Sequence, residues 1–403
     1  MKSIDFVGEA NKQFDSLKAL RRTLHQMPEF GLEVPNTLAL LLESVSGLGE
    51  VFLGKNMTAA ALVIKGSQPG PTVLIRTDMD ALAVIEDTGL EFSSTNGYMH
   101  ACGHDLHMAM VVGAARLIHQ HRDKLIGDVV VWFQPGEEGH GGADIMLEQD
   151  MHLVSGSMPI AAYGLHVFSS YPKGMFGARA GALMASAGGF TATFTGSGGH
   201  GSMPWLSKDP ITPMAEAISN IQGALNKRLD AFDPAVVNVG WVKAGDDHTE
   251  NVIPETASFG ATVRTFSAEN SSKLKEVVGD VLNGIAAAYG VKVSVEWHPA
   301  TKVLMNEARA VDRSRKLISE MFGPERYYEM PTPMAGGEDF ASVLDVMPGA
   351  FIFMGACVDG VNPATAPTNH SNRAVFDDSV IPSGTAFLAA LTFDTLNEAA
   401  QQK

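Results

Sequence analysis

The sequence predicts an α/β fold, in which helices cover both faces of a mostly parallel sheet, with a smaller α+β domain inserted into it. Three observations support this prediction. Short runs rich in Val, Ile and Leu alternate with helical patterns before residue 186. Residues 186–297 then follow the order β-α-β-β-α-β, which is typical of ferredoxin-like domains. A length of 403 residues also favours two domains over one core.

The first part of the catalytic domain is expected to span residues 1–185. Apolar residues recur at helical spacing from Phe6 to Leu24 until Pro28 ends the pattern, and a second helix follows Asn36. The later elements expected in this part are strands at 61–66 and 72–80, a buried helix at 105–119, and strands at 128–136 and 161–167.

The inserted domain is expected to span residues 186–297 and the second part of the catalytic domain residues 298–403. The insertion begins with a strand in which apolar and polar residues alternate, a pattern typical of a half-exposed antiparallel sheet. Its other predicted elements are a helix at 213–229, strands at 235–245 and 257–266, a helix at 271–289 and a strand at 291–297. The last part is predicted to contain a helix at 311–321, a strand at 350–356 and a helix at 384–399.

Composition narrows the class of protein. The formal net charge of −16 argues against nucleic-acid binding, which needs a basic face. Neither a signal peptide nor a membrane-spanning run is expected, so the predicted location is the cytoplasm, without membrane association. Two cysteines, Cys102 and Cys357, cannot form a disulfide framework in a chain of this length.

The segment HACGHDLH contains the strongest chemical signal. It places Cys102 among His100, His104 and His107 at the start of a predicted helix. Thiolate and imidazole groups suit zinc, cobalt, nickel or manganese-class ions. The alternative, a buried free cysteine beside solvated histidines, is common for single residues but not for four together.

The segment QPGEEG places Glu137 and Glu138 in a loop directly after a predicted strand. In most proteins two adjacent glutamates are simply part of the solvent-exposed acidic surface. Here Pro135, Gly136 and Gly139 fix a loop at the carboxyl edge of the sheet, where α/β proteins bind ligands. One carboxylate can bind a metal while the other acts as a general base.

Other candidates carry weaker signals. His166 ends a strand-like run and His370 lies in a loop, and either alone is more often structural or solvated. Asp80 follows a strand and is expected either to close an ion pair or to hold a ligand imidazole. In the inserted domain, His200 lies in a glycine-rich turn and Arg264 on a strand.

In this order, the chain carries RTDMDAL, HACGHDLHMA, QPGEEG, GLHV, GGHGSMP, NVIPE, VRTF and GGEDF. This series resembles the hippurate hydrolase and auxin-conjugate hydrolase group of the aminoacylase/carboxypeptidase G-like superfamily of dinuclear metallohydrolases. The resemblance runs from about His25 to the C-terminal segment.

The resemblance implies two divalent ions per subunit, either Mn, Zn, Co or Ni, with Cys102 bridging them. The implied ligands are Cys102, His104, Glu138, His166 and His370. Glu137 would be the general base. The inserted domain would act as a lid and dimerisation domain, with His200 reaching the partner's active site, while Asn251 and Arg264 would contact the substrate carboxylate.

The predicted function is hydrolysis of the amide bond of N-acyl amino acids, either hippurate-like or N-acetyl conjugates. A water that bridges the ions would lose its proton to Glu137 and attack the carbonyl. The expected partners are this small-molecule substrate and a second copy of the chain, as a homodimer or higher homo-oligomer. The alternatives are a dipeptidase or carboxypeptidase of the same superfamily, and a non-catalytic metal-binding scaffold, against which the Glu137–Glu138 pair speaks.

Overall fold

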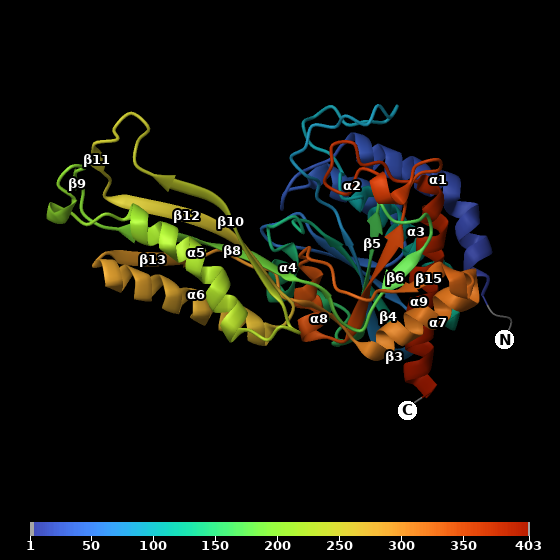
Figure 1. Cartoon of the computed structure of the whole chain (residues 1–403). Helices are drawn as coiled ribbons and strands as arrows, with labels where there is room; N and C mark the ends of the chain where they lie inside the picture. The colour runs from blue at the N-terminus through green and yellow to red at the C-terminus, as the bar shows by residue number, and fades with distance from the viewer. Residues whose placement is uncertain (1–3, 402–403) are drawn as a thin grey trace. The chain divides into compact units, whose positions relative to one another are not determined.

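The computed structural model describes residues 4–401, which form two compact units (Figure 1). The larger unit contains residues 4–183, 305–332 and 339–401, and the smaller unit contains residues 184–304 and 333–338. The predicted outer limits, residues 1 and 403, lie outside the described residues.

The smaller unit extends beyond the predicted 186–297 to residues 184–304, and it also includes residues 333–338, a segment predicted to belong to the catalytic domain. Its backbone is tied to the smaller unit by the Ala185 N–H, which donates to Met334 O at 2.9 Å, and by Arg264 Nε, which donates to Ala335 O at 2.9 Å. These partners are more than 70 residues away in the chain, so a local sequence pattern carries no sign of them.

Within residues 4–401, the larger unit has an eight-stranded sheet of order β1-β2-β4-β3-β5-β16-β6-β15. The strands are β1 (Glu50–Leu53), β2 (Ala60–Lys65), β3 (Gln68–Asp78), β4 (Ile126–Gln134), β5 (Pro159–Phe168), β6 (Phe176–Ala178), β15 (Tyr327–Glu329) and β16 (Gly349–Gly355). β3 runs parallel to β4 and β5, and β5 runs parallel to β16. The mostly parallel sheet confirms the predicted fold class.

Helices cover both faces of this sheet (Figure 1). On one face α1 (Phe6–Gln26), α3 (His104–Gln120) and α9 (Ile381–Gln401) pack against one another, while α4 (Gly142–Glu148) and α8 (Phe340–Val346) pack together elsewhere on the sheet. α2 (Pro35–Ser44) contacts α3, and α7 (Ala308–Phe322) contacts α9. α3 is buried almost all round, because its apolar residues occupy every side.

Among the described residues, α9 alone belongs to a helix long and apolar enough to cross a membrane. Most of that segment is buried inside the protein, and α9 contacts α1, α3 and β3. A core helix of a large α/β domain has the same length and composition. These contacts account for its apolar character.

The smaller unit has a four-stranded antiparallel sheet of order β10-β12-β8-β13, with α5 and α6 packed together against it (Figure 1). The elements are β8 (Ser186–Thr195), α5 (Ile211–Arg228), β10 (Ala235–Ala244), β12 (Thr256–Thr265), α6 (Ala268–Tyr289) and β13 (Lys292–Trp297). Alternate residues of β8, including Phe190 and Phe194, are buried against the helices.

Four further short strands lie outside these two sheets. They are β7 (Gly181–Met184), β9 (Gly199–His200), β11 (Val252–Ile253) and β14 (Leu304–Asn306). β9 pairs with β11, and β7 pairs with β14. The β9–β11 pair holds the glycine-rich turn of His200 against the segment that follows Asn251.

Candidate metal centre and active site

The candidate residues of the larger unit lie where parallel strands end. Asp80 follows β3, Glu137 and Glu138 follow β4, and His166 lies near the carboxyl end of β5. Because β3, β4 and β5 run in the same direction, these ends meet at one edge of the sheet. The start of α3 supplies Cys102 and His104 to the same edge.

Gly103 makes the turn between Cys102 and His104. Its φ is +85°, and a Cβ added to it would lie 2.5 Å from Val167 Cγ2. Only glycine combines this backbone conformation with so close an approach to β5. The turn therefore brings the Cys102 thiol and the His104 imidazole to the same place as His166.

Two groups of potential ligands share Cys102. The first is Cys102, His104 and His166, and the second is Cys102, Glu138 and His370, with donor atoms in each group within 4.8 Å of one another. Cys102 Sγ lies 3.4 Å from His166 Nε2 and 3.2 Å from His370 Nε2. Two three-residue groups with a common thiol suit two ions that share one ligand.

The ring nitrogens and carboxylate oxygens of these side chains that make no hydrogen bond to the backbone are suited to bind metal ions. His104 Nδ1 donates to Asp80 O at 2.8 Å and His166 Nδ1 donates to Val167 O at 2.9 Å, so both Nε2 lone pairs remain available. His104 Nε2 and Glu138 Oε1 are buried without a hydrogen-bond partner. His370 Nε2 lies 3.3 Å from Glu138 Oε1.

His370 lies on a loop between β16 and α9 and has φ of +70°, a left-handed conformation that is uncommon outside glycine. Its backbone N–H donates to Ala101 O at 2.9 Å, next to Cys102. The loop is therefore tied to the start of α3. This contact brings together residues that are far apart in the sequence.

His107 and His100 play different parts from His104. His107 Nδ1 donates to Asp78 Oδ1 at 2.7 Å, and its Nε2 accepts the Val167 N–H at 2.8 Å, so both nitrogens are used. His107 was predicted as part of the HACGHDLH cluster but is not among the implied ligands, and its spacing from His104 puts both on one helix face. His100 is buried, and burial lowers its pKa to about 3.

Burial and neighbouring charges set the protonation of the cluster. Burial, together with the charges of Glu138 and Glu137, raises the pKa of the Cys102 thiol well above its usual range. Burial lowers the pKa of His166 well below its usual value, which keeps its imidazole neutral. A neutral imidazole can bind a cation, and a cation beside the thiol would favour the thiolate.

Opposing effects act on His104. Burial acts to lower its pKa, but the negative charges of Asp78, Asp80 and Glu138 raise it overall. In Asp78 the order is reversed: burial acts to raise the pKa, but His104, His107 and Arg76 bring it well below its usual range. The cluster thus combines buried acids and histidines whose charges depend on one another.

Asp80 supports the site differently from the predicted carboxylate–imidazole pair. Its carboxylate accepts the backbone N–H groups of Glu137 and Glu138, both at 3.0 Å, while His104 binds its backbone carbonyl. The carboxylate itself stays 4.0 Å from His104 Nδ1. Adjacent N–H groups in the QPGEEG turn attract the carboxylate more directly than the imidazole does, so Asp80 fixes the glutamate loop.

Gly136 gives this loop its shape. Its φ is +73°, and an added Cβ would lie 2.5 Å from Leu32 Cδ2.

Asp339, from the GGEDF segment, accepts hydrogen bonds from Arg76, from Gln134 and from the Ala143 N–H. Asp339 therefore fixes the surroundings of the loop.

The other predicted site residues lie in the smaller unit. β9 pairs Val252 with His200, and the Gly201 N–H donates to Asn251 O at 2.7 Å, so His200 and Asn251 are neighbours. Arg264 lies at the other end of β12, opposite Ala187. Within this unit the structure therefore separates Arg264 from Asn251, with which the resemblance grouped it, and from His200.

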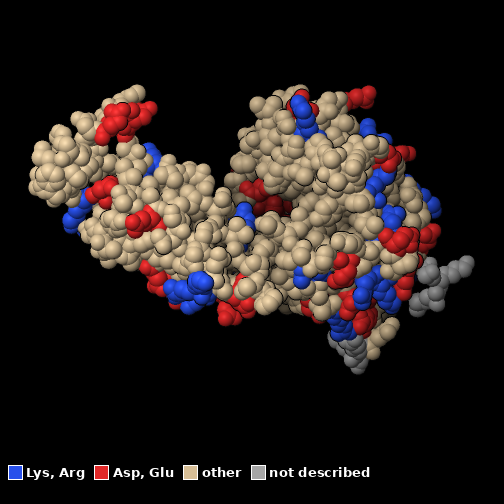
Figure 2. All heavy atoms as spheres, in the orientation of Figure 1, with Lys and Arg blue, Asp and Glu red and all other residues tan. Residues whose placement is uncertain are grey.

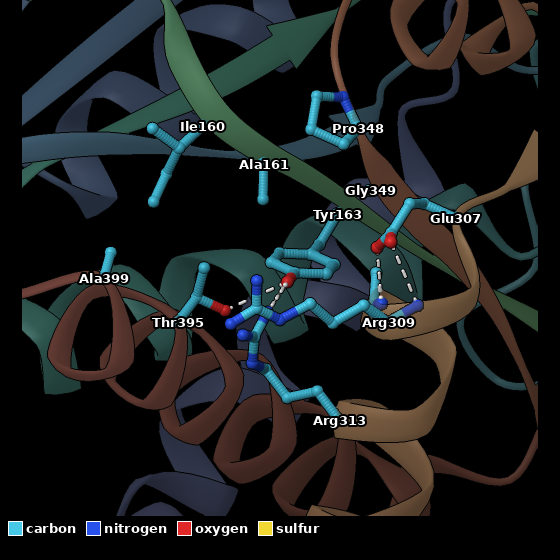
Figure 3. Close-up of a pocket in the computed structure, with 11 residues that line it drawn as sticks. Ile160, Ala161, Tyr163, Glu307, Arg309, Arg313, Pro348, Gly349, Thr395 and Ala399 are labelled. Atoms are coloured by element: carbon cyan, nitrogen blue, oxygen red, sulfur yellow. Dashed lines mark hydrogen bonds between the residues drawn. The ribbon is translucent and has the colours of Figure 1, made fainter. Parts of the chain in front are cut away.

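A cavity of about 330 Å³ lies near the amino end of β5, away from His166 (Figure 3). It is lined by Tyr163, Thr395 and Arg313, among others. Tyr163 OH contacts Thr395 Oγ1 at 2.9 Å, and Arg313 pairs with Asp394 at 3.2 Å. Its polar groups already have protein partners, and no candidate ligand lines it.

Comparisons with known proteins agree with this geometry. Residues 74–394 match the model of peptidase family M20/M25/M40. The chain is 34% identical to thermostable carboxypeptidase 1 of Saccharolobus solfataricus, with 95% of this chain and 96% of that protein covered. It is 32% identical to an Arabidopsis thaliana IAA-amino acid hydrolase, ILR1-like 4, with 97% and 90% covered.

A solved structure extends the match to the fold. The crystal structure of a dinuclear metal-binding peptidase of the M20 family from Bacillus subtilis has a TM-score of 0.82 to this chain, at 30% identity. The similarity covers 96% of this chain and 99% of that one. The chain therefore belongs to peptidase family M20/M25/M40 and is a metal-dependent amidohydrolase.

Proposed function

We propose that this protein hydrolyses the amide bond of N-acyl amino acids and releases a carboxylic acid and a free amino acid. One observation carries the proposal: two ligand groups share the Cys102 thiol directly beside Glu137, whose backbone is fixed by Asp80. A retained base next to two ion positions is the arrangement that hydrolysis requires.

In this proposal Cys102, His104 and His166 hold one divalent ion, and Cys102, Glu138 and His370 hold the other. Bound ions would supply Lewis acidity toward water and the amide carbonyl. Glu137 takes the proton of the attacking water and passes it to the leaving amine. Asp80 accepts the Glu137 backbone N–H, and this contact keeps the Glu137 carboxylate in place between the two proton transfers.

Arg264 is the proposed anchor for the α-carboxylate of the substrate. Its Nε and Nη1 donate to Ala335 O and Thr262 Oγ1, whereas Nη2 donates no hydrogen bond within residues 4–401. The side chain also forms no ion pair with an acidic residue in the described part of the chain. A half-buried guanidinium held in this way suits an anionic ligand group.

His200 is the proposed hydrogen-bond donor to the developing oxyanion. Its Nδ1 lies 3.2 Å from the Ser202 N–H and 2.9 Å from Ser202 Oγ. A backbone N–H can only donate, so Nδ1 is the acceptor and the proton of a neutral ring is on Nε2. The exposed Nε2–H is then free to donate to an oxyanion, with Asn251 beside it.

The separation within the smaller unit supports a site shared between two chains. His200 and Asn251 lie near the end of the sheet where Thr256 pairs with Thr195, whereas Arg264 pairs with Ala187 at the other end. Eight residues of β12 span about 26 Å. One amino-acid-sized substrate cannot reach both ends of this sheet, so Arg264 of one chain would act with His200 and Asn251 of its partner.

The smaller unit also offers a surface for that partner. β10 is an edge strand, and Val236, Trp241 and Val242 on it are 47%, 48% and 54% exposed. An exposed apolar edge strand is suited to pairing with another strand. We place the homodimer contact at this edge.

The test is hydrolysis of a substrate panel by purified protein loaded in turn with Mn²⁺, Zn²⁺, Co²⁺ and Ni²⁺. We expect turnover of N-benzoyl or N-acetyl amino acids, and loss of turnover after chelation. The similarity to a carboxypeptidase favours dipeptides or blocked peptides as the second substrate class. Faster turnover of dipeptides than of every N-acyl amino acid would replace the proposal with that alternative, and no metal-dependent turnover would refute both.

A further inference from the structure

Asn369 precedes His370 in the sequence and contacts three parts of the candidate metal centre. Its Nδ2 lies 3.2 Å from Cys102 O, 3.8 Å from Cys102 Sγ and 2.9 Å from Val167 O. Its Oδ1 accepts the Ser169 N–H at 3.0 Å. Asn369 is not among the residues predicted from the sequence, because its only sequence signal is its position beside His370.

The partners determine which way the Asn369 amide points. The Ser169 N–H can only donate, so the atom facing it is the oxygen, and the two carbonyl oxygens on the other side require the NH₂ group. Ser169 Oγ, 3.1 Å from Oδ1, also donates to Pro367 O at 2.7 Å. The amide therefore has one orientation, with its N–H groups toward Cys102.

These contacts join the two ligand groups. Val167 O accepts from both Asn369 Nδ2 and His166 Nδ1, so Asn369 shares the carbonyl that orients the His166 ring. The contact to Cys102 O holds the turn before α3, and the covalent link to His370 holds the left-handed residue of the second group. Asn369 thus acts on both groups without contributing a ligand.

The contact to Cys102 Sγ has a chemical consequence. Sulfur is also approached by His166 Nε2 and His370 Nε2, but those atoms would have to give their lone pairs to ions. Of these three neighbours, Asn369 is then the one left as an N–H donor to the thiolate. A hydrogen bond to a ligand sulfur reduces its electron donation and fixes its direction.

We propose that Asn369 is a positioning residue of the dinuclear centre, which aligns Cys102, His166 and His370 and donates a hydrogen bond to the shared thiolate. This inference rests on the proposed function. It assigns Asn369 no contact with the substrate. Its loss should weaken metal binding about 10-fold to 100-fold, the usual effect of removing such support.

The test is a Co²⁺ titration of metal-free protein, comparing wild type with Asn369→Asp and Asn369→Leu. Asn369→Asp keeps the size and the oxygen that faces Ser169 but removes the donor, and Asn369→Leu removes all the polar contacts. We expect at least about 10-fold weaker binding in both, and a shift of the thiolate-to-cobalt charge-transfer band to longer wavelength. Asn372→Leu, an exposed amide of the same loop, is the matched control and should match wild type.

The outcomes separate this inference from the proposed function. Wild-type protein that binds fewer than two ions refutes the dinuclear function itself. Wild-type protein that binds two, with Asn369 variants of equal affinity and unshifted spectra, overturns only the role of Asn369. Should both variants fail to fold, the smaller Asn369→Ala decides, because it removes the amide without adding charge or bulk: we expect about 10-fold weaker binding, and unchanged binding overturns the inference.

Discussion

At the scale of single residues, the site depends on which atoms of each side chain already have protein partners. His104 and His166 each use Nδ1 in a hydrogen bond to a backbone carbonyl, and no backbone N–H occupies Nε2, which is unpartnered in His104 and faces Cys102 Sγ in His166. His107 uses both nitrogens, on Asp78 and the Val167 N–H. The difference between a potential ligand and a supporting residue is therefore one hydrogen bond, although all three imidazoles are buried together.

Glu137 and Glu138 are adjacent but are expected to respond differently to substitution. Glu137→Gln keeps the size of the side chain and removes the base, so we expect kcat to fall about 10²-fold to 10⁴-fold. Metal content should stay at the wild-type level, measured by elemental analysis. Glu148→Gln, at the exposed end of α4, is the control. Residual turnover within a few-fold of wild type would exclude Glu137 as the base.

Cys102 and Cys357 form a natural matched pair, because both are buried free cysteines. Cys102 belongs to both ligand groups, whereas Cys357 Sγ donates to the Val358 and Val361 carbonyl oxygens and belongs to neither group. We expect Cys102→Ser to lose most bound metal and activity, and Cys357→Ser to keep both. Equal metal content in the two variants would remove Cys102 from the proposed ligand set.

At the scale of elements, α1 is tied to the segment that follows β3. His25 Nε2 lies 3.2 Å from Glu86 Oε1, and His25 Nδ1 lies 2.7 Å from Asp105 Oδ2 on α3. Glu86 also accepts the Ser94 N–H at 2.7 Å and the Thr88 hydroxyl. One histidine therefore connects a helix, a long loop and the helix that begins at His104.

The contact between His25 and Glu86 predicts that the stability of the protein depends on pH. Burial acts to raise the Glu86 pKa, but hydrogen bonds from His25, Thr88 and Ser94 lower it from 4.5 to about 2. The stabilisation is therefore present above pH 4.5 and is lost as pH falls toward 2. We expect Glu86→Gln to reduce the free energy of unfolding by about 2 kcal/mol at pH 6 and by much less at pH 3.

Urea denaturation at several pH values measures this effect, with the exposed Glu91→Gln as the control. The His25 pKa is raised, since the Asp105 and Glu86 interactions outweigh burial, so His25 contributes stability at low pH that is lost as pH rises through its folded value. At pH 6 the contributions of His25 and Glu86 both stabilise the contact between these two side chains. If the loss of unfolding free energy in Glu86→Gln does not decrease as the pH is lowered, the lowered pKa assigned to Glu86 is contradicted.

At the scale of the whole molecule, the proposed chemistry is divided between two units. The ligands and Glu137 belong to the larger unit, and His200, Asn251 and Arg264 to the smaller one. Acidic and basic side chains are interspersed over the face shown in Figure 2. The net charge of −16 favours solubility, and no step of the proposed mechanism uses it.

Subunit mixing tests the shared site. Glu137→Gln and His200→Ala chains are each expected to be inactive, but a mixed dimer would contain one site with an intact Glu137 and the partner's intact His200. Random exchange at equal concentrations should restore about one quarter of wild-type activity. Glu137→Gln mixed with Cys102→Ser is the control, since both changes affect the larger unit's own centre. No recovery, despite exchange shown by native mass spectrometry, would rule out the shared site.

The amino-acid sequence was enough to predict the fold class, the longer helices and strands, and the residues around which a metal centre could form, but not the short elements such as β1, α4 and α8. These features are local: apolar periodicity defines each element, and HACGHDLH and QPGEEG are short segments next to strand ends. Three features become visible only in the folded chain: Asp80 holds the glutamate loop, residues 333–338 join the smaller unit, and Asn369 contacts Cys102. The physical reason is separation along the chain, because Asn369 and Cys102 are 267 residues apart and meet only when the ends of parallel strands gather at one edge.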